Sequence, residues 1–475
     1  VLSNRRFLAA VGMACAACTA APDARETASP TAANAVSHPE WSRNAAIYEV
    51  NVRQFTPEGT FAAMQKHLPR LDSLGVDILW LMPVQPIGKK NRKGSLGSYY
   101  SIADYTSTNP EFGTKTDFKA LVGAAHGLGL KVILDWVPNH TAFDHPWTTQ
   151  HKSYYTLRPD GSISVARDND GKETDWTDVA DLNYDNREMR RAMIDAMKWW
   201  VDSMNVDGFR VDVAWGVPSD FWAEMRPALT AARADLFFLA EAEDPKLHQW
   251  FDMTYGWEFH HTLNDITKGQ KSTTVLDEYF EKQARTYPAD AFRMYFTSNH
   301  DENSWQGTEF ERMGANHLAA FVLAATIQNG MPLLYTGQEV SMNKRLRFFE
   351  KDTVDWKGQS LAGFYRRLFE LKESQPALAN GASGGTQSRI DIKLTNVKDH
   401  LRDDSRIYAF GRVKDSNVVV VVVNFGDQLA SLSVPDTKWA GNYRDMFNRS
   451  NPAMLGVQGG YLRVPAHGYR VLVRE

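Results

Sequence analysis

The sequence predicts an α/β protein built around a (β/α)8 TIM barrel, with a small domain inserted after the third strand and an antiparallel β-sandwich at the C-terminus. Two patterns predict this fold. Short apolar or β-prone runs alternate with segments of helical spacing along most of the chain, and the last part changes to short β-rich runs separated by turn residues. Strands that alternate with helices are typical of a parallel barrel, whose functional residues lie at the carboxyl ends of its strands.

Eight runs are expected to form the barrel strands. They are residues 46–52, 77–82, 131–137, 208–213, 236–240, a sixth strand with its loop in MTYGWEFHH (253–261), 293–297 and 333–335. Helical spacing of apolar residues is found at 61–74, 116–128, 187–204, 221–232 and 361–374. Between Asn139 and about Tyr184 the pattern dissolves into polar segments, so we expect the small inserted domain at about 141–184.

The C-terminal part has a different texture. RIYAFGRV, NVVVVVVNF, ASLSV and YLRVPAHGYRVLV are short β-rich runs separated by turn residues. They predict an antiparallel sandwich over 381–475, with 418–423 as a central strand because that run is apolar throughout. The barrel and its insert then occupy 41–380.

The N-terminus predicts export. Arg5 and Arg6 precede an apolar run that is too short for an ordinary membrane span and is typical of a secretory signal, expected at 1–18. Cys15 and Cys18 are the two cysteines of the chain, so disulfides cannot stabilise the rest. Ala16-Ala17-Cys18 resembles a bacterial lipoprotein processing site, and a plain signal peptide is the alternative.

Residues 19–40 are rich in Ala, Thr, Pro and Ser and predict a flexible linker. We therefore expect a periplasmic, extracellular or membrane-anchored protein whose lipid anchor would attach to a bacterial membrane. The oligomeric state leaves no trace in the sequence.

Composition excludes several classes of function. A chain of 475 residues with 43% hydrophobic residues is long enough for a barrel with appendages, and its net charge of -4 gives no support to nucleic-acid binding. The sequence contains no HExxH, GxGxxG or GxxxxGK[ST] pattern. Zinc proteolysis and dinucleotide or P-loop chemistry therefore lack support.

Three acidic residues follow predicted strands: Asp212 in GFRVDV, Glu241 in FFLAEAED and Asp301 in SNHDEN. Cleavage of a glycosidic bond with retention needs one carboxylate as nucleophile and one carboxylic acid as proton donor, about 5 to 5.5 Å apart. Arg210 lies two positions before Asp212, so both should point to the same face of the strand, where the arginine would keep Asp212 ionised. Glu241, as the acid, must keep its proton near neutral pH.

The same segments carry a resemblance to a known family. DWVPNH (135–140), GFRVDV (208–213), LAEAED with Glu241 and SNHDEN (298–303) resemble, in order, the four signature segments of the α-amylase family, glycoside hydrolase family 13. GVDILWLMP, VADLN and MPLLYTGQE resemble further segments of that family. The resemblance runs from about Trp41 to the C-terminus and implies the barrel fold and an α-glucan or maltooligosaccharide substrate.

Carried over residue by residue, the resemblance implies that Asp212 is the nucleophile, Glu241 the general acid/base and Asp301 the stabiliser of the transition state. It also implies five substrate-binding residues: Arg210 orients Asp212, Asp135 supports the site, Tyr100 stacks on the reacting ring, and His140 and His300 bind its hydroxyls.

One departure concerns calcium and the leaving-group side. Many members of the family have a Lys-His pair in the third and fourth positions after the nucleophile, and Trp215 and Gly216 stand there in this chain. Asn139 matches a calcium ligand, and Asp181 in VADLN is a second candidate, but the histidine carbonyl is missing. We expect no obligatory cofactor and leave calcium open. Trp215 should act as an aromatic platform, which favours shorter maltooligosaccharides.

Three functions follow from these patterns. The favoured one is a retaining hydrolase of α-1,4-glucosidic bonds in maltooligosaccharides or starch-derived glucans. A glucosyltransferase with the same carboxylates is the second, and a non-catalytic binding subunit is the third. Taken singly, each acid could be a helix cap or a turn residue. Three acids, one arginine and two histidines at the ends of different strands favour catalysis.

Overall fold

The computed structural model of the chain describes residues 36–395, 400–401, 403–456 and 460–475. The predicted signal peptide, the linker up to residue 35 and both cysteines lie outside the described residues, so export and lipid attachment stay predictions. None of the helices in the described ranges combines the length and the apolar character that a bilayer span requires.

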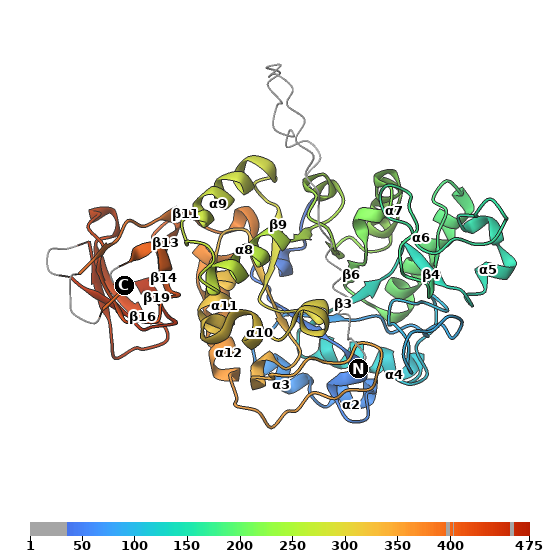
Figure 1. Ribbon diagram of the computed structural model, residues 1–475, viewed down its shortest axis with the longest axis horizontal. Helices are drawn as coiled ribbons and strands as arrows, with labels where there is room; N and C mark the ends of the chain where they lie inside the picture. Colours follow the sequence, from blue (N-terminus) through green and yellow to red (C-terminus); the bar gives the residue numbers. More distant parts are fainter. Residues whose placement is uncertain (1–35, 396–399, 402, 457–459) are drawn as a thin grey trace, which may run out of the picture.

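The centre of the molecule is a closed barrel of parallel strands (Figure 1). Its strands are β1 (Ile47–Val50), β2 (Ile78–Leu81), β3 (Lys131–Trp136), β6 (Gly208–Val211), β7 (Phe237–Ala240), β8 (Met253–Tyr255), β9 (Phe292–Phe296) and β10 (Gly330–Tyr335). They follow one another around the barrel in chain order, and β10 pairs with β1 to close it. The predicted fold class is confirmed.

The strands are apolar throughout because both of their faces are buried. On β2, Ile78 and Trp80 point into the barrel, where they pack with Ile133 and Phe237, whereas Leu79 and Leu81 belong to the outer core beneath the helices. This alternation follows from the two-residue period of a strand.

Helices cover the outside of the barrel. They include α4 (Lys115–Gly127), α6 (Arg187–Met204), α7 (Ser219–Ala232), α8 (Trp257–Thr267), α9 (Val275–Thr286), α10 (Glu309–Met313), α11 (His317–Thr326) and α12 (Ala362–Ser374). Thr114 and Asp117 form a capping box at the start of α4, and Asn186 caps α6. These polar side chains satisfy backbone N–H groups that have no partner within the helix.

Two sequence predictions were wrong in detail. The helix predicted at 61–74 is two helices, α2 (Phe61–Gln65) and α3 (Leu68–Ser73), because Pro69 is tolerated only in the first turn of a helix and therefore starts a new one. The loop expected after the sixth strand is instead the start of α8, since WEFHH continues directly into a helix after Gly256.

The segment between β3 and α6 is a small lobe beside the barrel. Its β4 (His140–Ala142) pairs antiparallel with β5 (Val179–Asp181), and the short α5 (Trp147–Gln150) lies at its outer end (Figure 1). We call the segment from His140 to Asp181 the insert. It covers one side of the barrel's carboxyl end.

The C-terminal domain consists of two antiparallel sheets. One has the order β11 (Thr386–Arg389), β13 (Ile407–Lys414), β14 (Asn417–Asn424), β19 (Gly468–Arg474), β16 (Gly441–Asp445) and β17 (Ala453–Leu455), and the other contains β12 (Lys393–Leu394), β15 (Ala430–Ser433) and β18 (Leu462–Val464). On β14, Val419 and Val421 join the core shared with α11, whereas Val420 and Val422 face the second sheet. The run is wholly apolar because the strand is buried on both faces.

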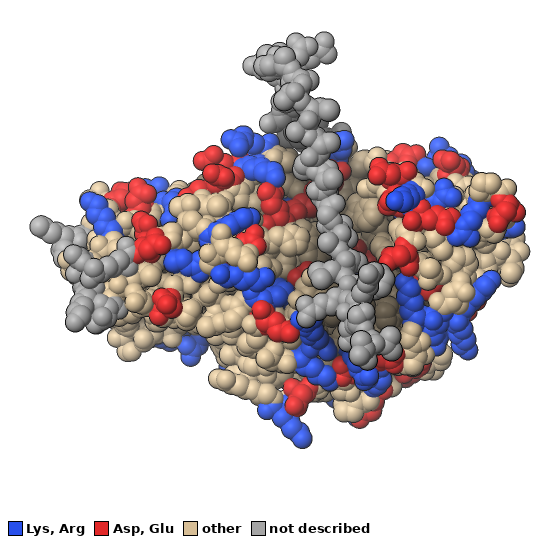
Figure 2. Space-filling model, viewed as in Figure 1, with Lys and Arg blue, Asp and Glu red and all other residues tan. Residues whose placement is uncertain are grey.

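The surface carries charges of both signs. Lys and Arg lie interspersed with Asp and Glu over much of the face shown in Figure 2. This distribution agrees with the small net charge of -4.

At Gly208, strand β6 lies very close to the backbone of its neighbour β7. A Cβ atom at this position would lie 1.9 Å from the carbonyl oxygen of Phe237 on β7. We expect Gly208→Ala to lower the free energy of unfolding by about 3 kcal/mol or more, because the clash is with backbone. Urea denaturation followed by circular dichroism measures the loss.

The matched control is Gly123→Ala on α4, where nothing lies within 4 Å of the added methyl group. It should raise the free energy of unfolding by about 0.5 to 1 kcal/mol, since alanine favours a helix over glycine. Equal stability of the two variants would contradict the close-approach explanation.

Candidate active site

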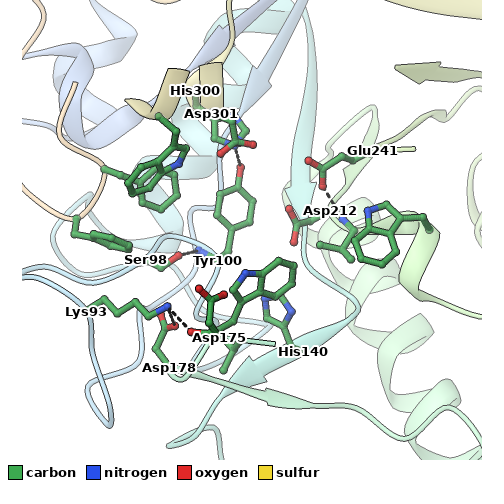
Figure 3. A pocket seen from close by; sticks show the side chains of 17 residues that line it. Lys93, Ser98, Tyr100, His140, Asp175, Asp178, Asp212, Glu241, His300 and Asp301 are labelled. Carbon is green, nitrogen blue, oxygen red and sulfur yellow. Dashed lines mark hydrogen bonds and ion pairs between the residues drawn. The ribbon is translucent and has the colours of Figure 1, made fainter. Parts of the chain in front are cut away.

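A pocket of about 510 Å³ opens at the carboxyl end of the barrel (Figure 3). Seven of the residues selected from the sequence line it: Tyr100, His140, Asp212, Trp215, Glu241, His300 and Asp301. Asp135 and Arg210 are buried and bind these residues through side-chain contacts. The structure therefore brings all nine predicted catalytic and substrate-binding residues to one place.

Arg210 is the centre of the charged cluster. Its Nη1 donates to Asp135 Oδ1 at 3.0 Å and to Asp212 Oδ1 at 2.9 Å, and its Nη2 lies 2.9 Å from Glu241 Oε1. Nε donates to the hydroxyl of Tyr255 at 3.1 Å. Strand register explains the first contact, because Asp135 and Arg210 are neighbours on β3 and β6. One guanidinium thus contacts the two acids expected to do the chemistry.

A second chain of hydrogen bonds runs from Asp135 to β1. The hydroxyl of Tyr100 donates to Asp135 Oδ2 at 3.1 Å and lies 2.8 Å from His300 Nε2, whose Nδ1 lies 2.6 Å from Glu49 Oε1. Trp80 Nε1 also donates to Asp135 Oδ2, at 3.0 Å. These contacts fix the planes of Tyr100 and His300 against the pocket.

Burial sets the electrostatics of the acids. It raises the pKa of Asp212 well above the ordinary range; the carboxylate of Glu241 adds to this, and Arg210 opposes it. The expectation that Arg210 by itself keeps Asp212 ionised is therefore corrected, because burial outweighs the ion pair. Burial and the neighbouring carboxylate thus favour the neutral form of Asp212, whereas the ion pair with Arg210 favours its carboxylate.

The same effect extends to the neighbouring acids. Burial raises the pKa of Asp135 to about 6, against the opposing charge of Arg210. It also raises the pKa of Asp301, against the opposing charge of His300. Burial therefore favours the neutral form of both acids, and their cationic neighbours favour the carboxylate form.

The two histidines of the site differ in charge. Burial lowers the pKa of His140 to about 4, so this imidazole is neutral at neutral pH. Burial opposes the charge of His300 too, but the carboxylates of Asp301 and Glu49 outweigh it and raise the pKa of His300 to about 9. His300 is thus an imidazolium whose two N–H groups donate to Glu49 and Tyr100.

Val213 holds Glu241 in place from a strained backbone. Its φ of 45° lies in the left-handed region, where a β-branched residue is an outlier. Its N–H donates to Glu241 Oε2 at 2.7 Å. Strain of this kind costs about 1 to 3 kcal/mol and gathers at functional sites. Sequence reasoning missed this residue, since nothing in GFRVDV signals a left-handed valine.

Some of the acidic residues are helix-cap or turn residues, the alternative to a role in catalysis, and others are not. Asp104 accepts hydrogen bonds from the backbone N–H of Thr106 and from the hydroxyl of Ser107, as a turn residue does. Asp301 precedes a short π-helical turn (Glu302–Gln306), but its Oδ2 lies 3.3 Å from His300 Nε2 at the pocket. The position of Asp301 therefore favours a role in the site.

Several pocket residues gave no usable signal in the sequence. They are Glu49 beneath the pocket and Lys93, Asp175, Trp176, Asp178, Trp305, Phe348 and Phe349 around it. A glutamate inside the apolar run IYEV could have revealed Glu49, because a buried strand seldom carries an unpaired charge. The others lie on loops, where composition does not tell which side chain faces the site.

The predicted calcium ligands do not form a recognisable cation site. Asn139 Nδ2 donates to His140 Nδ1 at 3.2 Å, and Asp181 Oδ1 accepts the backbone N–H of Arg167 at 3.1 Å. Calcium takes six to eight oxygen ligands. Within the part of the chain that the structure describes, no group of three or more His, Cys, Asp or Glu side chains is arranged for a metal. Asn139 and Asp181 alone do not supply such a ligand set, and the expectation that no cofactor is obligatory stays a prediction.

A parallel barrel with carboxylates, an arginine and two histidines at its strand ends defines a class of barrel enzymes that work by acid/base and nucleophilic chemistry. Comparison with family models identifies the family. The α-amylase catalytic domain matches residues 31–409, and the α-amylase C-terminal all-beta domain matches residues 398–473. The chain belongs to the α-amylase family of glycoside hydrolases and transglycosylases.

Individual relatives agree with this. The chain is 30% identical to the α-amylase MalA of Haloarcula japonica, over 84% of this chain and 58% of that protein. It is 34% identical to an α-1,4-glucan:maltose-1-phosphate maltosyltransferase of Mycobacterium tuberculosis, over 79% and 55%. The chain thus spans little more than half the length of these relatives. A solved α-amylase from Lactobacillus plantarum is 31% identical with a TM-score of 0.78, covering 92% of this chain and 100% of that one.

The Glu49 contact generates a prediction about His300. Glu49→Gln removes one of two carboxylates that favour the imidazolium, so the pKa of His300 should fall from about 9. A histidine pKa raised by folding stabilises the protein below about pH 6.5, and this contribution is lost as pH rises to about 9. The variant should therefore lose less stability than the parent across that window.

Histidine NMR titration measures the shift, with His300→Asn used to assign the signal. The signal of His140, whose pKa is about 4, serves as the internal control. An unchanged His300 titration in Glu49→Gln would show that the contact does not set the charge.

Proposed function

We propose that the protein is a retaining glycoside hydrolase that cleaves α-1,4-glucosidic bonds in maltooligosaccharides or starch-derived α-glucans. One observation carries the proposal: Asp212 and Glu241 contact the two terminal nitrogens of one guanidinium and face the same pocket. A nucleophile and a proton donor on opposite sides of one sugar linkage are what a retaining mechanism requires.

In the first step, the carboxylate of Asp212 attacks the anomeric carbon while the bond to the leaving oxygen breaks and Glu241 transfers its proton to that oxygen. This forms a glycosyl ester on Asp212. In the second step, water attacks the same carbon, Glu241 takes up a proton from the water, and the ester bond breaks to regenerate Asp212. The Val213 N–H supports this cycle because it holds one oxygen of Glu241 while the other faces Arg210.

The remaining polar side chains orient the reacting ring. Tyr100 presents its ring at the pocket, and His140, His300 and Asp301 line the wall where sugar hydroxyls would lie. Both N–H groups of His300 already donate to Glu49 and Tyr100, so His300 would act on the ring by fixing Tyr100. The Nδ1 of neutral His140 accepts from Asn139, so its Nε2–H can donate to a sugar hydroxyl. Asp301 would bind hydroxyls as the ring distorts toward the transition state.

Trp215 supports the preference for shorter substrates. It follows the nucleophile closely in the chain, and 41% of its surface is exposed at the pocket. An indole at this place offers a flat face for a leaving-group sugar in place of the lysine found in many relatives of the family.

A glucosyltransferase is the second candidate function. Some relatives are α-1,4-glucan:maltose-1-phosphate maltosyltransferases, and one of them is 34% identical to the chain. In that reaction a sugar hydroxyl instead of water resolves the ester on Asp212.

Glu241→Gln tests the proton donor. The amide cannot protonate the leaving oxygen, so turnover of maltooligosaccharides should fall by about 10² to 10⁴. A glucoside with a good leaving group should be spared in its first step. Steady-state kinetics on both substrates measure the difference. Glu281→Gln, an exposed carboxylate on α9, is the matched control and should keep parental rates. Equal loss on both substrates would contradict the role.

The two candidate functions are separated by incubation with maltotriose and chromatography of the products. Hydrolysis should yield glucose and maltose, because water reaches the ester through the open pocket. Oligosaccharides longer than maltotriose would outnumber these products if transfer predominates. The ratio is measured at early times, before products are consumed again.

A further inference from the structure

The loops around the pocket do not surround it evenly. We call residues 82–114, between β2 and α4, the β2 loop, and residues 341–361, between the short helical turn Gln338–Val340 and α12, the β10 loop. The β2 loop contacts both the insert and the β10 loop, so these three segments form a continuous wall along one side of the pocket.

The first junction joins the β2 loop to the insert. Lys93 Nζ lies 3.3 Å from Asp178 Oδ1 and donates to the carbonyl oxygen of Asp175 at 3.2 Å. The hydroxyl of Ser101 donates to the carbonyl oxygen of Asp178 at 3.1 Å. The side chain of Asp178 is buried, which protects this ion pair from screening by salt. Figure 3 shows Lys93, Asp175 and Asp178 together at one edge of the pocket.

The second junction joins the β2 loop to the β10 loop. Leu96 N–H donates to the carbonyl oxygen of Phe349 at 3.0 Å, and Ser95 N–H donates to Glu350 Oε1 at 2.9 Å. Gly94 makes the close approach feasible, since a Cβ atom there would lie 2.4 Å from Phe349 Cβ and its φ is +63°. The backbones of the two loops are therefore held together.

Aromatic packing continues the wall to the end of β9. The ring centroids of Phe348 and Phe349 are 5.1 Å apart, and Trp305, four residues after Asp301, lies 5.3 Å from Phe348. Phe348 also stacks on Tyr100, with centroids 6.2 Å apart. We call this set the glycone wall: Lys93, Asp178, Ser95, Leu96, Phe348, Phe349 and Trp305.

The chemistry determines which end of the substrate meets this wall. Glu241 must protonate the leaving oxygen, so the leaving sugar lies on the side of Glu241. The rest of the glycone, the part that becomes attached to Asp212, must extend in the opposite direction. In Figure 3, Glu241 and Lys93 lie at opposite edges of the pocket, with Asp212 and Tyr100 between them. The glycone therefore points at the wall.

We infer that the pocket is blind on its glycone side and that the enzyme removes short units from the non-reducing end of an α-glucan chain. This inference rests on the proposed function and specifies how that same site acts. A chain that continues beyond one or a few sugar units would have to pass through the glycone wall. The volume of about 510 Å³ falls within the range of pockets that enclose a small ligand.

A maltoheptaoside with a 4-nitrophenyl group at its reducing end tests the inference, used unblocked and with an ethylidene block on its non-reducing glucose. The parent enzyme should cleave the unblocked substrate, release short products first, and cleave the blocked one about 100-fold more slowly, because the block clashes with the wall. Equal rates on both substrates, with fragments of intermediate length first, would overturn the blind pocket while the proposed hydrolase stands. Cleavage of neither substrate would refute the proposed function itself.

The junctions are tested by the double variant Lys93→Ala/Glu350→Ala, which removes one side-chain contact at each junction, Lys93 with Asp178 and Ser95 with Glu350. Its rate on the blocked substrate relative to the unblocked one should rise by about tenfold or more over the parent ratio. Lys89→Ala is the matched control, because Lys89 contacts Asp144 through its backbone N–H. Its ratio should equal that of the parent. A double variant with the parent ratio would contradict the assignment of closure to these contacts.

Discussion

The burial of Arg210 among carboxylates is the constraint on which the site depends. A guanidinium without solvent is costly unless opposite charges compensate it, and Asp135, Asp212 and Glu241 do so directly. Glu49 and Asp301 add two carboxyl groups around His300, the second cation of the site. The acidic groups of the site therefore outnumber its cationic groups. Burial favours the neutral form of Asp212 and Asp301, whereas Arg210 and His300 favour their carboxylate forms. Acid/base and nucleophilic chemistry depends on such a balance of opposing effects.

The barrel supplies the rigidity that this balance requires. Asp135 and Arg210 are register partners on β3 and β6, and Glu241 follows β7 directly, so strand pairing places the charges. The backbone at Val213 is strained in order to aim one N–H at Glu241. The insert and the loops after β2 and β10 are built on this base, and they decide which substrates reach it.

The residues predicted from the sequence were those that strand ends and family motifs reveal. Asp212, Glu241 and Asp301 follow β-prone runs, and the structure brings them to one pocket; their roles in catalysis stay proposals. The wrong predictions have local causes: Pro69 divides one helix into two, and α8 begins directly after Gly256, so WEFHH is helical where a loop was expected. Lys93, Phe348 and Trp305 were not predicted as pocket residues, because residues in loops show no periodic pattern in the sequence.

The sequence by itself determined the barrel, the C-terminal sheets and the acids at the strand ends, because hydrophobic periodicity and short motifs are local properties of the chain. Only the tertiary structure decided the charge states of His140 and His300, the balance between burial and Arg210 at Asp212, and the closure of one side of the pocket. These depend on contacts between residues far apart in the chain, such as Glu49 with His300 and Lys93 with Asp178. Burial and electrostatic coupling are properties of the assembled fold, and no local pattern encodes them.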